Sequence, residues 1–263
     1  MSCALAIGGL DPGGGAGIAA DLRAFTRAGV FGGAVVAVLT VQSTRGLELA
    51  RTVSPRLVVA QLDEVVRTQR VRALKIGALG ARANVVALAE WLARHPGIPV
   101  VLDPVMIPTR GRQRLLSGRG LDALRKHLLP RSDLVTANAP EAAALTGVGV
   151  SSVADARRAA LALLDLGAAA AMVKGGHLAG TRSVDVLAYL PRGARAPRTL
   201  ELDASRLALP PIHGGGCILA ALVAGRIAAG HSLLPAVRWA RRVHRAALVS
   251  AVDVGGPLRV LSP

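Results

Sequence analysis

Short apolar runs alternate with stretches of helical periodicity along the whole chain, and this alternation constrains its fold more than any single motif does. Short apolar runs are typical of buried strands, whereas Ile18, Leu22 and Phe25 recur at the spacing of one helix face. Strands that alternate with helices form a largely parallel sheet covered by helices. We therefore predict an α/β fold with strands at 4–9, 34–41, 73–76, 100–103, 134–136, 170–174 and 184–189.

Helices are expected between these strands. Proline disfavours helical geometry in the residue before it, so a helix over 118–128 should stop before Pro130. Other helices are expected at 82–95, about 215–229 and 233–251, and the Pro- and Arg-rich region 191–212 should be irregular with room for one edge strand. Because no internal repeat or linker is evident, we expect one domain over residues 1–263.

The overall charge raises nucleic acid as a partner, but the distribution of the charge argues against it. The formal net charge is +16 and the pI is about 11.7, and clustered cations bind phosphate backbones. Here the arginines are scattered, and the densest group (Arg238, Arg241, Arg242 and Arg245) has the spacing of one solvated helix face. The few aromatic residues cannot easily form a base-stacking platform. We therefore expect no nucleic-acid partner.

Hydropathy and cysteine content narrow the class further. With 52% hydrophobic residues and a mean hydropathy of +0.46, the chain is not generally disordered. No uncharged run reaches the roughly 18–20 residues of a membrane span, and the N-terminus lacks the basic start of a signal peptide. Cys3 and Cys217 are too few for a disulfide framework. We expect a cytoplasmic protein with no membrane partner.

Polar and glycine-rich clusters follow the predicted strands at their carboxyl ends, which is where open α/β sheets bind ligands. The first is rich in glycine and includes Gly9, with Asp21 a turn into the next helix. Gln42, Asp103 and Lys174 stand at the ends of later strands. Because the carboxyl ends of parallel strands meet at one edge of the sheet, we expect these clusters to converge there.

The run His213-Gly214-Gly215-Gly216-Cys217 precedes a long apolar stretch. Three glycines allow a sharp turn, and the helix that follows points its unpaired N–H groups and positive dipole end at the same spot. This predicts an anion site, in which a helix N-terminus would lower the pKa of Cys217 toward neutrality and make it a base or nucleophile. The alternative is a glycine turn before a core helix, with Cys217 as a small buried hydrophobe.

The common nucleotide and hydrolase motifs are missing, but phosphoryl transfer mainly needs positioned phosphates, a cation and an oriented hydroxyl. Lys174 can screen phosphate charge, and Glu141 or Asp103 can place Mg²⁺. Structural alternatives stay open, because Asn138 and Glu141 also fit a helix capping box and Asp103 can simply end a strand. The convergence of the clusters at one sheet edge favours a functional site.

Seven ordered segments resemble the hydroxymethylpyrimidine and phosphomethylpyrimidine kinases of thiamine biosynthesis, in the ribokinase-like superfamily. They begin at Gly8, Thr40, Lys75, Asp103, Asn138, Lys174 and His213, and they span nearly the whole chain. The resemblance implies a three-layer α/β/α sandwich with a largely parallel central sheet. It also implies a phosphotransferase that passes the γ-phosphoryl group of ATP, with Mg²⁺, to a pyrimidine hydroxymethyl group and then to the resulting monophosphate. A homodimer stays open.

The same resemblance implies roles for individual residues. Asp21, Gln42 and Gly9 would contact the pyrimidine. Glu141 and Asp103 would serve the metal, while Lys174, Asn138 and His213 would serve ATP and its phosphates. Gly214, Gly215 and Gly216 would form the anion hole, and Cys217 would stand where most ribokinase-like relatives carry an aspartate base.

The chain departs from the family pattern around the anion hole. The family run is His-Gly-Thr-Gly-Cys-Thr preceded by Thr, and this chain has Ile212, Gly215 and Ile218 at the three threonine positions. Each lost hydroxyl removes a hydrogen bond worth about 0.5–1.5 kcal/mol, and more to a charged oxygen. Two alternatives to the pyrimidine kinase are therefore a pyridoxal-type kinase and a catalytically weakened paralogue that binds a pyrimidine.

Overall fold

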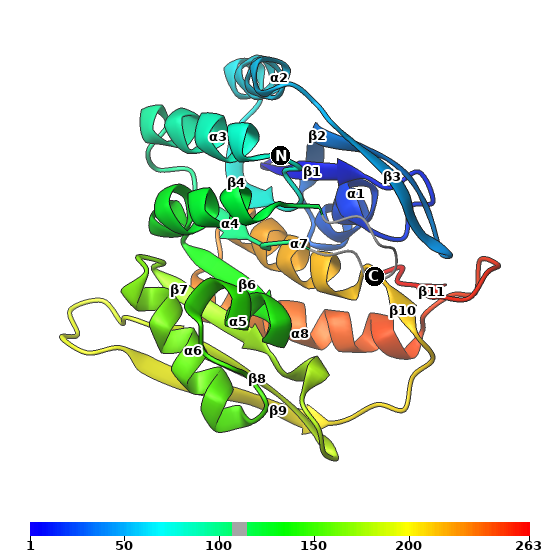
Figure 1. Ribbon diagram of the computed structural model, residues 1–263, viewed down its shortest axis with the longest axis vertical. Coiled ribbons are helices and arrows are strands. Elements are labelled where there is room, and N and C mark those ends of the chain that lie inside the picture. Colours follow the sequence, from blue (N-terminus) through cyan, green and yellow to red (C-terminus); the bar gives the residue numbers. More distant parts are fainter. Residues whose placement is uncertain (107–114) are drawn as a thin grey trace.

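The computed structural model describes residues 1–106 and 115–263. Its centre is a nine-stranded sheet in the order β3-β2-β1-β4-β5-β6-β7-β8-β9 (Figure 1). Neighbouring strands from β2 to β7 pair in parallel, while β3, β8 and β9 pair antiparallel at the two edges. The strands are β1 (Cys3–Leu10), β2 (Phe31–Ser43), β3 (Gly46–Thr52), β4 (Val71–Ile76), β5 (Val100–Leu102), β6 (Leu134–Asn138), β7 (Ala170–Lys174), β8 (Arg182–Tyr189) and β9 (Arg198–Ser205).

Helices cover both faces of the sheet, so the molecule has three layers (Figure 1). One face carries α1 (Gly17–Arg27), α7 (Gly215–Ala228) and α8 (Leu233–Val249). The other carries α2 (Pro55–Thr68), α3 (Arg82–Arg94), α4 (Gly118–Ala123), α5 (Ala139–Thr146) and α6 (Val153–Asp165). The expected α/β/α sandwich with a largely parallel sheet is confirmed.

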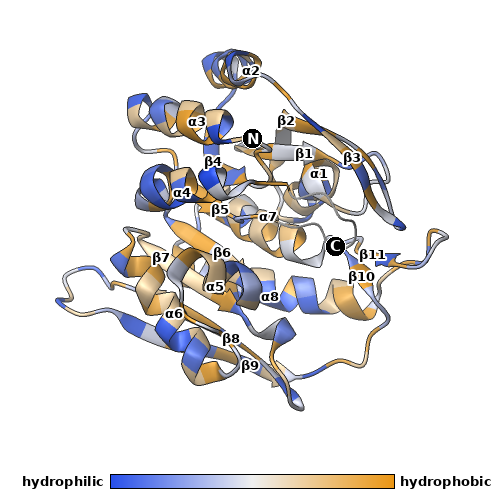
Figure 2. Ribbon diagram, in the orientation of Figure 1, coloured by the Kyte–Doolittle hydropathy of each residue, from blue (hydrophilic) through white to orange (hydrophobic). Residues whose placement is uncertain are grey.

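Alternation along the strands decides which side chain enters which layer. In β1, Leu5 and Ile7 pack toward α2 and α3, whereas Ala4 and Ala6 pack toward α7. The small side chains on the α7 face let this almost wholly buried helix lie close to the sheet. Figure 2 shows the same division: central strands are largely hydrophobic, whereas outer helices such as α2 and α6 carry hydrophilic residues on one side.

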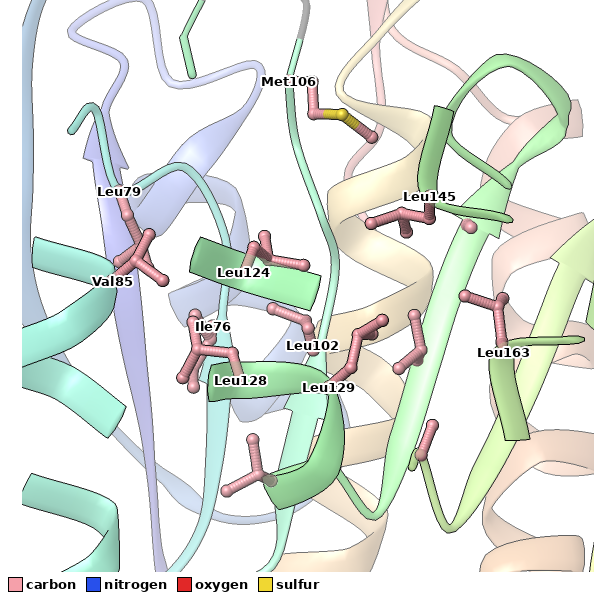
Figure 3. Close-up of a cluster of buried hydrophobic side chains, with 14 of the residues drawn as sticks. Ile76, Leu79, Val85, Leu102, Met106, Leu124, Leu128, Leu129, Leu145 and Leu163 are labelled. Carbon is pink, nitrogen blue, oxygen red and sulfur yellow. The ribbon is translucent and has the colours of Figure 1, made fainter. Parts of the chain in front are cut away.

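The larger aliphatic side chains fill the layer under α3, α4 and α5 (Figure 3). Ile76 and Leu102, from adjacent strands, meet Leu124, Leu128 and Leu129 of the segment that follows α4. Full burial of one such side chain contributes about 1.5–3 kcal/mol relative to leaving it exposed. This packing fixes the strands whose carboxyl ends form the site described below.

Most expected elements are present, including the edge strand for which the region 191–212 left room, and one helix ends differently from the prediction. The helical segment does not stop before Pro130: after α4 the chain forms a π-helical turn (Leu124–Leu128) and a 3₁₀ turn (Leu129–Arg131). Proline is tolerated there because it stands in the first turn of the 3₁₀ segment, where its missing N–H has no partner to lose. The region 191–212 contains a complete edge strand, β9, paired with β8 along its length.

A second, two-stranded sheet joins distant parts of the sequence. β10 (Ile212–His213) pairs in parallel with β11 (Arg259–Val260), and Arg23 of α1 donates to the carbonyl of Leu261. The segment around residues 259–261 therefore packs beside the loop after β1 and the start of α7. In the described part of the chain, no helix is long and apolar enough to cross a membrane.

Candidate active site

A cavity of about 620 Å³ opens at the carboxyl ends of the parallel strands. The expected site residues that line it are Gly9, Gln42, Asp103, Asn138, Glu141, Lys174, His213, Gly214, Gly215, Gly216 and Cys217. Asp21, by contrast, does not line it and is fully buried. The structure thus brings all the expected residues but one around a single space, as the geometry of a parallel sheet requires.

The first turn of α7 forms one end of the cavity. Gly214 caps the helix with φ 77°, and a Cβ there would lie 2.0 Å from the carbonyl oxygen of Gly15, so glycine is required on both counts. The first N–H groups of a helix have no partner within it, and they carry its positive dipole end. A Cβ on Gly216 would lie 3.2 Å from Lys174 Nζ, so a cation stands beside these N–H groups. This arrangement can hold an anion.

Lys174 lies between two carboxylates. Its Nζ is 3.0 Å from Asp103 Oδ1 and 3.9 Å from Glu141 Oε2, and Thr136 Oγ1 also donates to Asp103. Burial opposes ionisation of Asp103, but Lys174 and Lys75 outweigh it and hold the pKa of this carboxyl below its usual range. The pKa of Lys174 is raised, because the attraction of Asp103 and Glu141 exceeds the effect of burial.

Asn138 and Glu141 form the capping box of α5, as one of the two interpretations predicted. The Asn138 side chain accepts from the N–H of Glu141, and Glu141 Oε2 accepts from the N–H of Asn138 at 2.8 Å. Both residues also line the cavity. Their structural role in the capping box is therefore compatible with a role in ligand binding. Burial raises the pKa of Glu141 to about 7, against the attraction of Lys174.

The donor set suits a metal that arrives with its ligand. Within residues 1–106 and 115–263 there is no cluster of three His, Cys, Asp or Glu side chains that could hold an ion alone. Mg²⁺ is usually bound through one or two carboxylates together with substrate phosphates and water. Asp103 and Glu141, at the cavity wall, match that pattern, and Glu141 Oε1 makes no hydrogen bond to the described part of the chain.

Asp21 lies behind Lys75, which begins one of the seven family-like segments but to which the sequence assigned no role. Lys75 Nζ is 2.8 Å from Asp21 Oδ2 in a pair with almost no exposed surface, and Lys75 lines the cavity. Burial raises the pKa of Asp21 to about 6 even though Lys75 opposes the shift. The pKa of Lys75 is raised, because Asp21 outweighs burial. The position of Lys75 at the end of an apolar run was the sequence signal that could have identified it as a site residue.

The expected lowering of the Cys217 pKa is wrong for the protein without ligand. Burial raises the pKa of the thiol to about 12, and the nearby carboxylates of Asp103 and Asp21 add to this. Lys75 acts in the opposite direction but is outweighed. The helix N-terminus alone predicted an acidic thiol. Burial in the fold reverses that shift, and the carboxylates that add to it come from other segments.

His213 is held on the side of the cavity that Gln42 lines. Its Nε2 is 2.8 Å from Asp11 Oδ2 and 3.3 Å from Gln42 Nε2. Asp11, in the loop after β1, also accepts from the N–H groups of Gly13 and Ala16. The structure therefore engages this ring nitrogen with protein atoms, so it is not free for the expected contact with a phosphate.

A second group that the sequence reasoning missed anchors the loop after Lys174. Asp185 accepts from the N–H of Gly175 at 2.7 Å and from Arg241 Nε at 2.8 Å. His244 Nε2 lies 2.8 Å from the carbonyl oxygen of Gly215, and burial lowers the pKa of this imidazole to about 4. Arg241, His244 and Arg245 all line the cavity. Only part of the basic face of α8 is therefore solvated.

Comparisons with known proteins agree with this geometry. The family model described as phosphomethylpyrimidine kinase matches residues 11–259. A hydroxymethylpyrimidine/phosphomethylpyrimidine kinase of Rhizobium meliloti is 40% identical over 251 residues, which cover 95% of this chain and 91% of that protein. The enzyme of the same name from Streptomyces coelicolor is 39% identical over 252 residues, with 96% and 90% covered.

Two solved structures share the fold. An ADP complex of Bacillus subtilis pyridoxal kinase has a TM-score of 0.88 at 27% identity, over 99% of this chain and 96% of that one. Phosphomethylpyrimidine kinase from Clostridium difficile 630 has a TM-score of 0.79 at 30% identity, over 94% and 99%. The backbone is thus common to a pyridoxal kinase and a phosphomethylpyrimidine kinase. On the family model and on the identity with its curated members, the chain belongs to the phosphomethylpyrimidine kinase family.

Proposed function

We propose that this chain is an ATP-dependent kinase that phosphorylates 4-amino-5-hydroxymethyl-2-methylpyrimidine and then its monophosphate, in thiamine biosynthesis. The observation that carries the proposal is the cavity, which the N-terminus of α7, Lys174 and Gln42 line together. An anion site and a site for a small polar ring thus share one space. We further propose that residues 1–263 act as one kinase domain.

The phosphate end of the cavity is proposed to work by charge and position. Lys174 and the N–H groups of Gly215, Gly216 and Cys217 would bind the oxygens of the transferred phosphoryl group, where negative charge is spread in the transition state. Asn138, at the N-terminus of α5, would contact the ATP phosphates. Asp103, 3.0 Å from Lys174 Nζ, holds this ammonium at the cavity before phosphate arrives.

Mg²⁺ would be held by Glu141 and Asp103 together with the phosphates of ATP, and when bound it would neutralise phosphate charge. Glu141 offers the oxygen that its capping box leaves unused. Because Lys174 contacts both carboxylates in the protein without ligand, ATP and metal would have to draw its ammonium toward phosphate. The chain would thus exchange carboxylate partners of Lys174 for phosphate oxygens.

Cys217 would take the proton of the substrate hydroxyl. The hydroxymethyl oxygen forms a bond to the γ-phosphorus, the bond to the ADP oxygen breaks, and the hydroxyl proton leaves to the base. A thiol with a pKa near 12 is protonated in the protein without ligand. Burial raises this pKa most, and the charge of Asp103 adds to it. A metal held by Asp103 and Glu141 would offset the charge of Asp103 and so favour the thiolate in the loaded site.

Gln42 and Gly9 are proposed as direct contacts of the pyrimidine, since both line the cavity. Asp21 does not line it, and we propose that it acts through Lys75, which it holds at 2.8 Å. A protein that binds the pyrimidine without phosphorylating it is disfavoured, because the side chains proposed for catalysis all line the cavity. They are Lys174, Cys217, Asp103 and Glu141. A pyridoxal-type kinase is disfavoured, because the family model and the curated relatives describe pyrimidine kinases.

The test is ATP-dependent product formation by the purified protein, resolved by mass, with the hydroxymethylpyrimidine, its monophosphate and pyridoxal as separate substrates. Each reaction is run with Mg²⁺ and with a chelator. We expect mono- and diphosphate from the pyrimidine, no more than trace product from pyridoxal, and none in chelator. A preference for pyridoxal would overturn the substrate assignment. Absence of product together with pyrimidine binding in calorimetry would show a binder.

A further inference from the structure

Two buried side chains and one half-buried side chain connect the loop after β1, the start of α7 and the cavity wall. Asp11 and His213 are 2% and 3% exposed, and Gln42 lines the cavity. The imidazole of His213 occupies the space where a Cβ on Gly15 would be, only 2.4 Å from the ring atom Cδ2. The ring is therefore clamped in one position, and its hydrogen bonds are determined by what surrounds it.

Asp11 accepts three hydrogen bonds, which is the pattern of a carboxylate rather than a carboxylic acid. Its Oδ1 accepts from Gly13 N at 2.9 Å, and its Oδ2 accepts from Ala16 N at 2.9 Å and faces His213 Nε2 at 2.8 Å. Although burial opposes ionisation, the contacts with His213 and with these two N–H groups hold the pKa of Asp11 below its usual value. An ionised oxygen at 2.8 Å from a ring nitrogen requires a proton between them.

The proton must therefore be on Nε2 of His213. The other ring nitrogen, Nδ1, is buried without a hydrogen-bond partner among the described residues. An unpaired buried N–H costs more than an unpaired acceptor, so Nδ1 carries no proton and the ring is the Nε2–H tautomer. His213 thus presents a donor, not an acceptor, toward Asp11 and toward the end of Gln42.

This tautomer conflicts with a side-chain nitrogen of Gln42 in the same position. Gln42 Nε2 is 3.3 Å from His213 Nε2, and two N–H groups cannot satisfy each other. The two ends of a glutamine amide exchange places by a half-turn about the last side-chain bond. After that half-turn, the Gln42 oxygen faces the single Nε2–H of His213, which it shares with Asp11 Oδ2, and the NH₂ group becomes the end turned away from the imidazole.

We propose that Asp11 and His213 are positioning residues that fix the Gln42 amide with its NH₂ group toward the ligand, so that the cavity selects a ring with an unprotonated nitrogen. The inference rests on the proposed function for the identity of that ring, a pyrimidine with two ring nitrogens. The geometry of the Asp11–His213–Gln42 chain does not depend on it. Selection arises because an acceptor on the ligand gains a hydrogen bond that a C–H group cannot make.

The first test reads the tautomer directly and requires no substrate. Nitrogen NMR of the protein labelled with ¹⁵N-histidine distinguishes a proton on Nε2 from one on Nδ1. The His213 signals are identified by their loss in His213→Phe or, if that variant does not fold, by backbone assignment. We expect the proton on Nε2. A proton on Nδ1, or on both nitrogens, would overturn the inference even if the protein is an active kinase.

The second test measures whether the cavity selects a ring with an unprotonated nitrogen. Dissociation constants are measured for the hydroxymethylpyrimidine and for its two analogues in which one ring nitrogen is replaced by C–H. We expect wild-type protein to bind one analogue about tenfold more weakly, the value of one neutral hydrogen bond. Gln42→Glu, which offers only acceptors, should bind the pyrimidine more weakly than wild type and lose that discrimination. The inference would be overturned if wild-type protein bound both analogues as tightly as the pyrimidine. It would also be overturned if Gln42→Glu bound the pyrimidine as tightly as wild type does.

His213→Phe keeps the ring in its clamp but removes the donor. We expect its KM for the pyrimidine to rise about tenfold while kcat and the KM for ATP stay within about threefold, because the Gln42 amide is released while Asp11 keeps its two backbone donors. A fall in kcat with an unchanged KM would contradict a positioning role. Failure of the wild-type protein to bind or phosphorylate the pyrimidine would overturn the proposed function, and the NMR result would still decide the tautomer.

Discussion

Single residues in this site carry protonation states set by neighbours from other segments. The pKa of Cys217 is raised to about 12 by burial and carboxylates, that of Glu141 is raised to about 7 mainly by burial, and that of Asp103 is held low by Lys174 and Lys75. Asp103 is thus charged in this site while the Cys217 thiol keeps its proton. The charges of ATP and Mg²⁺ would change the pKa values of both groups.

Replacement of Cys217 tests its role as the base. We expect Cys217→Ala to lower kcat about 100-fold or more, the usual contribution of a general base, with the KM for the pyrimidine within about threefold. The matched control is Cys3→Ala, because Cys3 is buried in β1 and does not line the cavity. Steady-state kinetics measure both variants. Equal activity of Cys217→Ala and wild type would remove the thiol from the mechanism.

Glu141→Gln separates stability from activity. The folded-state pKa of about 7 exceeds the ordinary value of 4.5, so between these pH values the folded protein retains a proton that the unfolded chain has lost. Stability therefore falls as the pH rises through this window. Glutamine keeps the capping box without titrating.

We expect the free energy of unfolding of Glu141→Gln to exceed that of wild type by about 1–3 kcal/mol at pH 8 and to match it at pH 4, by urea denaturation. The same variant should have a lower kcat and require more Mg²⁺ for half-maximal rate. A variant that is less stable than wild type at pH 8 would contradict the linkage. Unchanged Mg²⁺ dependence would remove Glu141 from the metal site.

At the scale of elements, the start of α7 contains glycines with different tolerances. Among residues 1–106 and 115–263, a Cβ at Gly215 would meet His244 Nε2 at 3.8 Å and Ile212 Cγ2 at 3.9 Å, which is ordinary contact. A Cβ at Gly214 would overlap the carbonyl oxygen of Gly15, and its φ of 77° is unfavourable for other residues. Position 215 therefore has room for the threonine of the family pattern, and position 214 has none.

We expect Gly215→Thr to fold with unchanged or higher Tm, since glycine at a helix position is replaced by a less flexible residue. Its hydroxyl should lower the KM for ATP about two- to tenfold. Gly214→Ala is the matched comparison and should lose most of its stability or its activity. Thermal melts and ATP titrations test both. A destabilised Gly215→Thr would show that the loop has adapted to glycine.

Elements could be predicted from the sequence wherever one local signal decided them. The apolar runs indicated the parallel strands, and the carboxyl ends of those strands indicated the edge where the site lies. β3 was not predicted, because its mostly half-buried or exposed residues show no apolar run. The pairing of His213 with Asp11 spans 202 residues, and the Cys217 pKa depends on charges from three other segments. Such long-range contacts leave no signal in local periodicity.

At the scale of the whole molecule, residues from both ends of the sequence meet beside the site. β11 pairs with the strand that carries His213, and Arg23 donates to the carbonyl of Leu261. Leu258, Val260 and Leu261 are 2%, 8% and 0% exposed. The stability of the site and that of this segment are therefore coupled.

Deletion of residues 258–263 tests the coupling. Each of three buried aliphatic side chains contributes about 1.5–3 kcal/mol, so we expect a loss of several kcal/mol in the free energy of unfolding. We also expect weaker pyrimidine binding, because His213 loses its paired strand. The control is a deletion of residues 262–263, which leaves the three side chains in place. Urea denaturation and calorimetry measure both. Unchanged pyrimidine affinity in a folded 258–263 deletion would show that β11 does not support His213.

The two glycine loops interlock. The missing Cβ of Gly214 makes room for the carbonyl of Gly15, and the missing Cβ of Gly15 makes room for the ring of His213. Each loop therefore depends on residues of the other. A chimera that takes its first 20 residues from one kinase and its remainder from another keeps this contact only where one parent has glycine at position 15 and the other has histidine and glycine at positions 213 and 214.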